Sequence, residues 1–570
     1  MKKTITRFVI IALAINYSIA ANAQVMQPQK NNSKKEKGSF SQKIKSALLT
    51  APQSSATPGL IDGTDVQIHP SANVQAEVTI ALNKTNPQNL VASANTLIGP
   101  FNYNQGYYYS YDGGASWGGK DSLQNISVGT VSGDPSVCFA ANGAAYLTAI
   151  NASSGYWFQR SNDGGATWSA GKKGSNTISF DKEMSASDDQ LTSPYKNNFY
   201  CSWTNFSSGG GSVEFNRSTD KGLTFSTPIT LRSGAIGFGQ GTNVQTGPNG
   251  EVYVCWADHK TVTSPYKADA LGFARSMDGG VTFTPAAKPF NYKGIRVDGF
   301  DATFNHSRVN DFPAMAVDKS NGAHRGRIYV TYPAKQNDTG KSVIYVRWSD
   351  DKGTTWSAGK VVSIPNGRQN WFPWIAVDDS TGRVWVDYYS FDKPTGFLTN
   401  TYVAVSPNGG NTWFNRVVSD VPHKTAAIDN NNFAYGYAGD YIGLAVYGGK
   451  ATAVWMDDRT GDWQVYATSI TESRSAPLTG TYSDAETLKV NSIISAKISA
   501  GPNPFTSYII IKGADKFASV QLCTQAGIVA KQWKNFESNM LNVSDVPKGI
   551  YLLKVTVDNI SVPFTETLIK

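Results

Sequence analysis

A nine-residue pattern recurs six times between residues 109 and 413, and it limits the possible fold more than any other feature of the chain. The copies are YSYDGGASW (109–117), RSNDGGATW (160–168), RSTDKGLTF (217–225), RSMDGGVTF (275–283), WSDDKGTTW (348–356) and the degenerate VSPNGGNTW (405–413). The fourth residue of each copy is acidic or, in the last copy, asparagine: Asp112, Asp163, Asp220, Asp278, Asp351 and Asn408. Successive copies are 51, 57, 58, 73 and 57 residues apart. A repeat at this period indicates a propeller or another array of similar units.

Each copy has the composition of a tight turn between two strands. The aspartate can accept hydrogen bonds from backbone N–H groups of its own turn, and glycine permits the positive φ that such a turn needs. One binding site does not require six copies. We therefore expect the repeated aspartates to hold structure rather than to carry out catalysis.

The spacing Ser-x-Asp-x-Gly-x-Thr-Trp resembles the Asp-box, or bacterial neuraminidase repeat. The resemblance to sialidase-like Asp-box proteins covers most of residues 75–470, and it implies a β-propeller in which each box is a corner remote from catalysis. Sialidases hold the substrate carboxylate with three arginines, and the first of these precedes the first box. Here no arginine lies between Arg7 and Arg160. The first arginine of the triad is therefore absent, and true sialidase activity is not expected.

A second repeat predicts four-stranded blades. Short apolar segments start at residues 77, 134, 183, 243, 312, 372 and 441, and aromatic-rich strands follow them. Two strands and a hairpin that carries the box make one blade, so residues 60–475 predict an all-β propeller of seven blades, with six blades as the alternative. The last blade has no box. We expect its outer strand to come from GTDVQIHP (63–70), which closes the ring and protects an edge.

The N-terminal segments predict export. Residues 1–23 combine a basic start, the apolar run FVIIALAI and the small-residue end Ala-Asn-Ala, which is typical of a secretory signal peptide. Residues 24–59 are rich in Lys, Ser, Gln, Asn and Pro, and they predict a disordered basic linker. These segments account for the whole formal net charge of +8. We expect no nucleic-acid partner, because the rest of the chain has no basic excess, and no transmembrane segment.

The C-terminal segment has a different character. ISAGPNPFTSYIIIKG (498–513), GIYLLKVTVDN (549–559) and the final Lys570 resemble the C-terminal sorting domain of the type IX secretion system of Bacteroidota. The resemblance implies that residues 485–570 form a small β-sandwich that directs export through the type IX machinery and is commonly removed. The product is then secreted or attached to the outer-membrane surface.

Patterns for metals and cofactors are missing from the sequence. Four cysteines in a chain of 570 residues do not form a disulfide framework, and buried thiols are the simpler interpretation. The chain has no CxxC pair, HExxH motif or phosphate-loop glycine pattern. We expect no metal and no cofactor.

Candidate site residues follow from the predicted topology. If the boxes join the third and fourth strands, the starts of the innermost strands line the opposite mouth of the channel. The residues there are Glu77, Asp134, Lys182, Glu183, Asn243, Asp311, Asn370, Trp371, Asp440 and Tyr441, with Arg308 and Tyr437 close behind. We predict catalytic roles for Glu183, Asp311, Asp440 and Tyr441, and substrate-binding roles for Arg308, Trp371 and Asp134.

Two functions fit these features. The first is an enzyme on extracellular glycans or glycoproteins, a glycoside hydrolase or a polysaccharide lyase, in which carboxylates or a tyrosine with a base transfer protons. The alternative is a non-catalytic glycan-binding or adhesion propeller, with Trp371, Trp374 and Tyr441 as stacking surfaces. Fold-level analogy favours the enzyme slightly. The sequence does not indicate which glycan is bound.

Overall fold

The computed structural model describes residues 60–472 and 499–569. The gaps in this description are residues 99–102, 128–130, 152–154, 208–209, 262–265, 286–287, 298–300, 338–339, 365–366, 395, 425–438, 502–506, 513–516, 525–528, 537–539 and 557–563. The predicted signal peptide, the predicted linker and Tyr437 lie outside the described residues. The chain divides into two compact units, residues 1–476 and 477–570.

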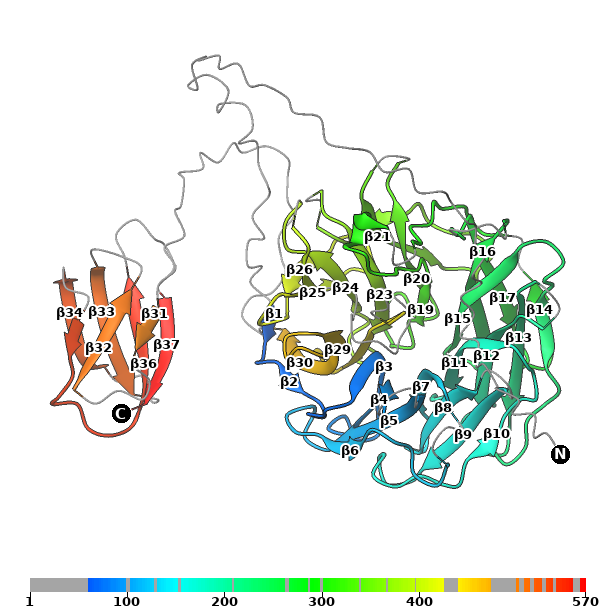
Figure 1. Cartoon of the computed structure of the whole chain (residues 1–570), viewed down its shortest axis with the longest axis horizontal. Helices are drawn as coiled ribbons and strands as arrows, with labels where there is room; N and C mark the ends of the chain where they lie inside the picture. The colour runs from blue at the N-terminus through cyan, green and yellow to red at the C-terminus, as the bar shows by residue number, and fades with distance from the viewer. Residues whose placement is uncertain are drawn as a thin grey trace, which may run out of the picture. The chain divides into compact units, whose positions relative to one another are not determined.

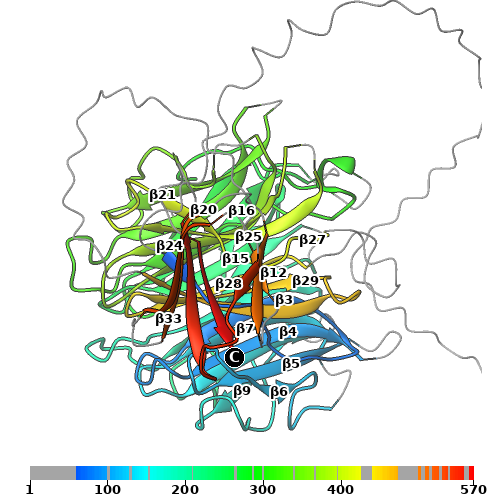
Figure 2. The same ribbon diagram turned by 90° about the vertical axis from the view of Figure 1, so that its left-hand side faces the viewer.

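Unit 1 is a β-propeller built from antiparallel sheets, which we call blades (Figure 1). Blade 1 contains β3 (Val74–Leu82), β4 (Leu90–Leu97), β5 (Tyr103–Ser110) and β6 (Gly118–Lys120). Blade 2 contains β7 (Gly133–Phe139), β8 (Ala145–Asn151), β9 (Gly155–Ser161) and β10 (Lys172–Lys173). Blade 3 contains β11 (Phe180–Ser187), β12 (Phe199–Asn205), β13 (Ser212–Ser218) and β14 (Ile229–Arg232). Figure 2 shows the strands of blade 1 in succession.

The remaining blades repeat this order. Blade 4 contains β15 (Phe238–Thr246), β16 (Val252–His259), β17 (Ala270–Ser276) and β18 (Thr284–Pro285). The 3-10 helix η1 (Ala302–Phe304) precedes blade 5, which contains β19 (Ala314–Val317), β20 (Ile328–Lys335), β21 (Ser342–Ser349) and β22 (Lys360–Val361). Blade 6 contains β23 (Asn370–Val377), β24 (Val384–Phe391), β25 (Leu398–Ser406) and β26 (Phe414–Val417), and β27 (His423–Lys424) pairs with β25. Blade 7 contains β28 (Gly443–Tyr447), β29 (Lys450–Asp457) and β30 (Gln464–Glu472).

The innermost strands form a closed ring. In the described part of unit 1, β3, β7, β11, β15, β19, β23 and β28 each contact the next one, and β28 contacts β3. The N-terminal strands β1 (Leu60–Asp62) and β2 (Val66–Gln67) pair with β30 as the outer edge of blade 7. The expected outer strand from GTDVQIHP is thereby confirmed. The ring is closed by strands from both ends of unit 1.

The repeated boxes lie between the third and fourth strands of their blades, as predicted. In the second box, Asp163 Oδ1 accepts hydrogen bonds from the Thr167 backbone N–H at 3.0 Å and from Ser161 Oγ at 2.7 Å. Ser161 Oγ in turn accepts from the Gly165 N–H at 2.9 Å. The other aspartate boxes repeat this arrangement. These hydrogen bonds keep each carboxylate within its own turn.

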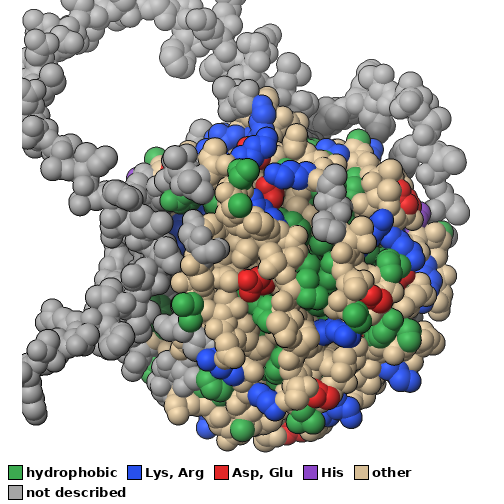
Figure 3. Space-filling view, turned by 90° about the vertical axis from the view of Figure 1, so that its right-hand side faces the viewer, with side chains coloured by type: hydrophobic (Ala, Val, Ile, Leu, Met, Phe, Trp, Pro, Cys, Tyr) green, Lys and Arg blue, Asp and Glu red, His purple; other side chains and the backbone are tan. Residues whose placement is uncertain are grey.

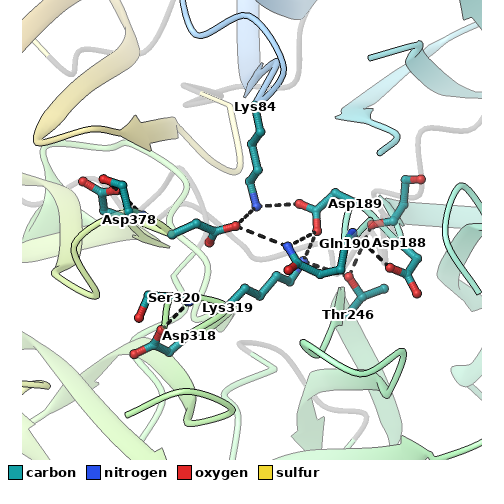
Figure 4. A network of polar contacts seen from close by, with 12 residues as sticks. Lys84, Asp188, Asp189, Gln190, Thr246, Asp318, Lys319, Ser320 and Asp378 are labelled. Carbon is teal, nitrogen blue, oxygen red and sulfur yellow. Dashed lines mark hydrogen bonds and ion pairs between the residues drawn. The ribbon is translucent and has the colours of Figure 1, made fainter. Parts of the chain in front are cut away.

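Charged side chains cross the channel at its box-side end. Lys84 Nζ pairs with Asp189 Oδ2 at 2.6 Å and also with Asp379. Lys319 Nζ pairs with Asp189 Oδ1 at 2.8 Å and donates to Thr246 Oγ1 at 2.8 Å. We call Lys84, Asp189, Lys319 and Asp379 the axial ion-pair network, and Figure 4 shows the two lysines converging on Asp189. It connects blades 1, 3, 5 and 6 across the axis.

Unit 2 contains two antiparallel sheets around a small apolar core. One sheet has the order β31 (Ser499–Gly501), β32 (Tyr508–Lys512), β35 (Met540–Asn542). The other has the order β34 (Val529–Phe536), β33 (Phe517–Thr524), β36 (Ile550–Thr556), β37 (Phe564–Ile569). Buried side chains from both sheets, among them Ile509, Leu522 and Leu553, form one cluster.

Candidate functional site

A β-bulge recurs near the start of the innermost strands. The strand register shifts at this point in β3, β7, β11, β15 and β23. A residue with positive φ lies in each bulge, namely Glu77 (56°), Asp134 (50°), Lys182 (50°), Gly241 (68°) and Phe372 (47°). Only glycine adopts this conformation without cost. Bulges of this kind redirect side chains and are common at barrel rims and next to active sites. The end of the channel opposite the boxes therefore carries backbone strain on several blades.

Lys182 and Tyr441 form the floor of this mouth. Lys182 Nζ lies 3.3 Å from the centroid of the Tyr441 ring, a cation–π contact between blades 3 and 7. The Tyr441 hydroxyl donates to the Pro135 carbonyl at 3.0 Å, and the Lys182 N–H donates to Asp134 Oδ2 at 3.0 Å. All three side chains are almost fully buried. Asp134, Lys182 and Tyr441 are thus brought together from three blades, below the accessible surface.

Arg308 and Asp440 lie at the more accessible level. Arg308 Nη2 donates to Asp440 Oδ1 at 2.8 Å and to Oδ2 at 2.9 Å. Asn310 Nδ2 donates to the same carboxylate at 3.1 Å and to the Asp440 carbonyl at 2.8 Å. The side chains of Arg308 and Asp440 are 33% and 19% exposed. Burial raises the pKa of Asp440, but Arg308, Asn310 and Arg296 outweigh it and hold that pKa below its usual value.

Asp181 is a candidate site residue that the sequence analysis did not identify. This half-buried carboxylate lies directly before the bulge of β11 and accepts a hydrogen bond from Gln240 Nε2. Gln240 Oε1 accepts from Arg296 Nη1 at 2.6 Å. The amide of Gln240 therefore joins Arg296 to Asp181 and fixes the orientation of both. Asp181 and Gln240 both precede the bulge in neighbouring blades, and this shared position was the available sequence signal.

The pKa values of the two accessible carboxyl groups are shifted in opposite directions. Burial, together with the charges of Asp134 and Asp440, raises the pKa of Asp181 to about 7, although Gln240 and Arg296 act in the other direction. Asp440 stays ionised beside Arg308. Pairs of carboxyl groups whose environments separate their pKa values in this way are typical of acid–base sites. The mouth can therefore hold one proton-donating carboxyl group next to one carboxylate.

Glu183 and Asp311 are buried away from this surface. Glu183 is fully buried, and neither of its carboxylate oxygens has a hydrogen-bond partner among the described residues. Burial and the Asp134 charge raise its pKa well above the usual value, more than Lys182 lowers it. Asp311 accepts from the Ala268 N–H at 2.8 Å and lies 3.6 Å from His259 Nε2. As placed, neither side chain is accessible to a polymer.

Trp371 is covered rather than exposed. Its side chain is 1% exposed, and its ring lies 5.5 Å from Phe304 of η1 and 4.9 Å from Phe391. This packing removes the stacking surface expected from the sequence. Trp374 is the partly exposed tryptophan of the same strand, and its ring centroid is 6.2 Å from that of Tyr441. Of the other mouth residues, Glu77 accepts from Asn95 Nδ2 at 2.6 Å, while Asn370 donates to the Ser342 carbonyl.

A narrow pocket marks this mouth among the described residues. It is lined by Lys182, Gly241, Thr242, Asn243, Asn310, Phe312, Pro313, Phe372, Pro373, Trp374, Asp440 and Tyr441. Its free volume of about 10 Å³ has room for about one water molecule. A ligand larger than a water molecule would therefore have to lie over the mouth rather than inside it. In the described part of the chain, no group of three or more His, Cys, Asp or Glu side chains could hold a metal ion.

Comparisons with known proteins identify one segment of the chain. Residues 500–569 match the secretion system C-terminal sorting domain, which marks the protein for secretion and cell-surface attachment and implies the type IX machinery as a partner. No curated protein matches the chain. None of the helices in the described residues is long and apolar enough to cross a membrane.

Solved structures similar to the chain include three of distinct kinds. A protein of unknown function from Dyadobacter fermentans is 14% identical, with 73% of this chain and 100% of that chain covered and a TM-score of 0.42. The Hadza microbial sialidase Hz136 is 13% identical, with 69% and 65% covered and a TM-score of 0.37. The GH93 α-L-arabinofuranosidase of Fusarium graminearum is 14% identical, with 60% and 92% covered and a TM-score of 0.38. Similarity at this level assigns neither an activity nor a substrate.

Proposed function

We propose that this exported propeller acts on an extracellular glycan, free or attached to protein, at the mouth opposite the boxes. The observation that carries the proposal is the pair Asp181 and Asp440, which interact electrostatically and whose environments shift their pKa values in opposite directions, to about 7 for Asp181 and below the usual value for Asp440. Cleavage of a glycosidic bond by hydrolysis or elimination needs one group that gives a proton and one that accepts a proton or stabilises positive charge.

Each accessible residue has a role in this proposal. Asp181 donates the proton to the leaving oxygen, with Gln240 and Arg296 holding its carboxyl group in place. Asp440 is the base or the negative charge that faces the developing positive centre, and Arg308 keeps it ionised. Tyr441 and Asp134 shape the floor through Lys182. Glu183 and Asp311 support the strand starts from within, because both are fully buried.

A binding protein without catalysis is the second candidate. One observation favours it: the mouth is packed by the contact between Lys182 and Tyr441, so little of a ligand can enter the channel. In that case Trp374 provides the stacking surface, and Arg308 and Asn310 bond to sugar hydroxyl groups.

Turnover assays of the full chain distinguish the two candidates. The wild-type protein is tested on a panel of polysaccharides and glycoproteins, with reducing-end release as the readout for hydrolysis and absorbance of unsaturated products as the readout for elimination. Loss of a general acid or a general base lowers turnover about 10²- to 10⁴-fold, so Asp181→Asn and Asp440→Asn are each expected to do so. Asp458→Asn is the matched control, because burial raises the pKa of Asp458 to about 6 and its carboxylate accepts from the Lys424 N–H at 2.9 Å, a contact that involves none of the proposed catalytic residues.

The outcomes are mutually exclusive. Full turnover in Asp181→Asn contradicts the catalytic assignment. No product from any substrate, combined with glycan affinity that is lost in Trp374→Ala, supports the binding protein instead. Neither product nor affinity contradicts both candidates.

A further inference from the structure

A groove lies on the described surface of the propeller at its outer rim, between blades 2 and 3. One wall is the run Lys172–Thr177, which begins with the edge strand β10. The other is Leu223–Pro228, which begins with the last three residues of the third box and ends directly before β14. The groove has a volume of about 570 Å³, within the range of about 300–1,000 Å³ typical of ligand sites. It lies beside the outermost strands β10 and β14, whereas the mouth lies at the starts of the innermost strands.

The lining combines two cations with hydroxyl and amide groups. Lys172 and Lys173 are both exposed, and neither ammonium group has an ion pair or hydrogen bond recorded in the described part of the chain. No carboxylate lines the groove. Asn176, Thr177, Ser226 and Thr227 add polar groups that suit sugar hydroxyls.

The nearest carboxylates already have partners. Glu214 accepts hydrogen bonds from Thr177 Oγ1, Trp203 Nε1 and Asn205 Nδ2 at 3.2, 3.1 and 2.7 Å. Asp220 is occupied within its own box by Ser218 and Thr224. These bonds hold both carboxylates away from Lys172 and Lys173, and no ion pair joins them to either lysine among the described residues.

The floor of the groove is rigid. The half-buried Phe225 lies edge-on to Tyr156, Phe158 and Phe199, with ring centroids 5.9, 5.5 and 6.0 Å apart. At the rim, Leu223 exposes 63% of its side chain. A preformed apolar floor below a basic and hydroxyl-rich wall needs little reordering to bind a ligand.

Comparison with other blades shows which feature of this groove is not part of the repeated blade pattern. Lys120 in blade 1 and Lys360 in blade 5 occupy the same register as Lys172, each paired with the residue three positions before the box serine. The next residue is Asp121 in blade 1 and Val361 in blade 5. Of these three blades, only blade 2 has two adjacent cations. Lys172 alone is explained by the repeat, whereas the pair with Lys173 is not.

We propose that this groove is a second, non-catalytic site that binds an anionic polysaccharide bearing carboxylate or sulfate groups. Charge complementarity carries the choice of ligand, and the exported location places the groove among extracellular polymers. The chain's own segment 24–59 does not fit, because its six lysines against one glutamate repel a basic groove. This inference goes beyond the proposed function and does not depend on any turnover.

Binding of defined polymers to the full chain tests the site. Calorimetry at low ionic strength is performed with dextran sulfate, polygalacturonate and unmodified dextran. Exposed charge pairs each change an equilibrium by about two- to fivefold, so Lys172→Ala combined with Lys173→Ala is expected to weaken binding of the two anionic polymers about fivefold or more. Lys120→Ala combined with Lys360→Ala removes the same charge from equivalent strands and is expected to have little effect.

Hydrogen exchange locates the bound polymer. Slower exchange confined to residues 172–177 and 223–228 supports the proposal. The same protection is expected in Asp181→Asn, because the mouth is a separate site. Three results overturn it: equal binding of unmodified dextran, equal loss of affinity in the control double variant, or protection outside both segments. An acidic protein that competes with dextran sulfate, while polygalacturonate does not bind, overturns the choice of ligand.

Discussion

Asp181 gains its proton affinity from burial and from two neighbouring carboxylates, so pH tests its role directly. As the general acid it must be protonated. We therefore expect kcat/KM to fall as pH rises through about 7, the pKa of Asp181, and to lose this alkaline limb in Asp181→Asn. The measurement is a pH–rate profile of the full chain on its best substrate. An alkaline limb that persists in the variant at the same pH assigns the proton to another group.

The box aspartates provide a second prediction at the scale of one residue. Asp163→Ala removes the acceptor of the Thr167 N–H and of two hydroxyl groups, and one such bond contributes about 0.5–1.5 kcal/mol. The melting temperature is expected to fall while activity per folded molecule stays constant. The melting temperature of Asp163→Asn is expected to fall less. An asparagine can keep one of these bonds, since Asn408 accepts from the Thr412 N–H at 2.9 Å in the sixth box. Loss of activity without loss of stability contradicts a structural role.

The sequence could predict which residues gather at the end of the channel opposite the boxes, but not which of their side chains are accessible there. Side chains normally alternate between the two faces of a strand, so the sequence can assign a face to each residue. The bulges interrupt this alternation where the candidate residues lie. Lys182 and Asp134 are consequently buried with Tyr441, while Asp181 remains accessible. Phe304, which covers Trp371, comes from the long connection between blades 4 and 5, and local patterns do not predict such contacts.

At the scale of elements, the axial ion-pair network couples turns of separate blades. Lys84→Met leaves Asp379 without its lysine and Asp189 with Lys319 alone. The side chains of Lys84 and Asp189 are 30% and 16% exposed, so we expect a loss of about 1–3 kcal/mol, less than for a fully buried pair. Denaturant unfolding measures this loss. Asp379→Asn in the same chain is expected to recover part of it, and the exposed Lys120→Met serves as the control.

Recovery in the double variant is the critical result. A double-mutant cycle that shows no coupling between Lys84 and Asp379 means that their contact contributes nothing to stability, whatever the single variants do.

The elements themselves were more predictable than this network. The boxes and the outer strand of blade 7 follow from local residue types and from the need to cover a sheet edge, whereas the network depends on turns 105 to 295 residues apart.

At the scale of the whole molecule, closure of the ring depends on the strands β1 and β2. Deleting residues 60–67 exposes the edge of β30 and removes the contacts of Asp65 with Arg459 and Asp420. We expect a lower melting temperature and association through the exposed edge, measured by calorimetry and light scattering. Deleting residues 24–59 instead is expected to leave both unchanged. Equal behaviour of the two deletions contradicts closure by these strands.

Processing at both ends follows from the export signals. If residues 1–23 are a signal peptide and the sorting domain is removed after export, the mature protein begins near Gln24 and lacks most of residues 485–570. Intact-mass measurement of the surface-released form tests this expectation, with the full chain made in a cytoplasm as the reference. Recovery of residues 500–569 on the released product contradicts removal.

Deletion of the same residues is expected to retain the propeller in the periplasm, because the sorting signal is then lost while the fold of unit 1 is unaffected. Release of that shortened chain into the medium contradicts the need for the sorting domain.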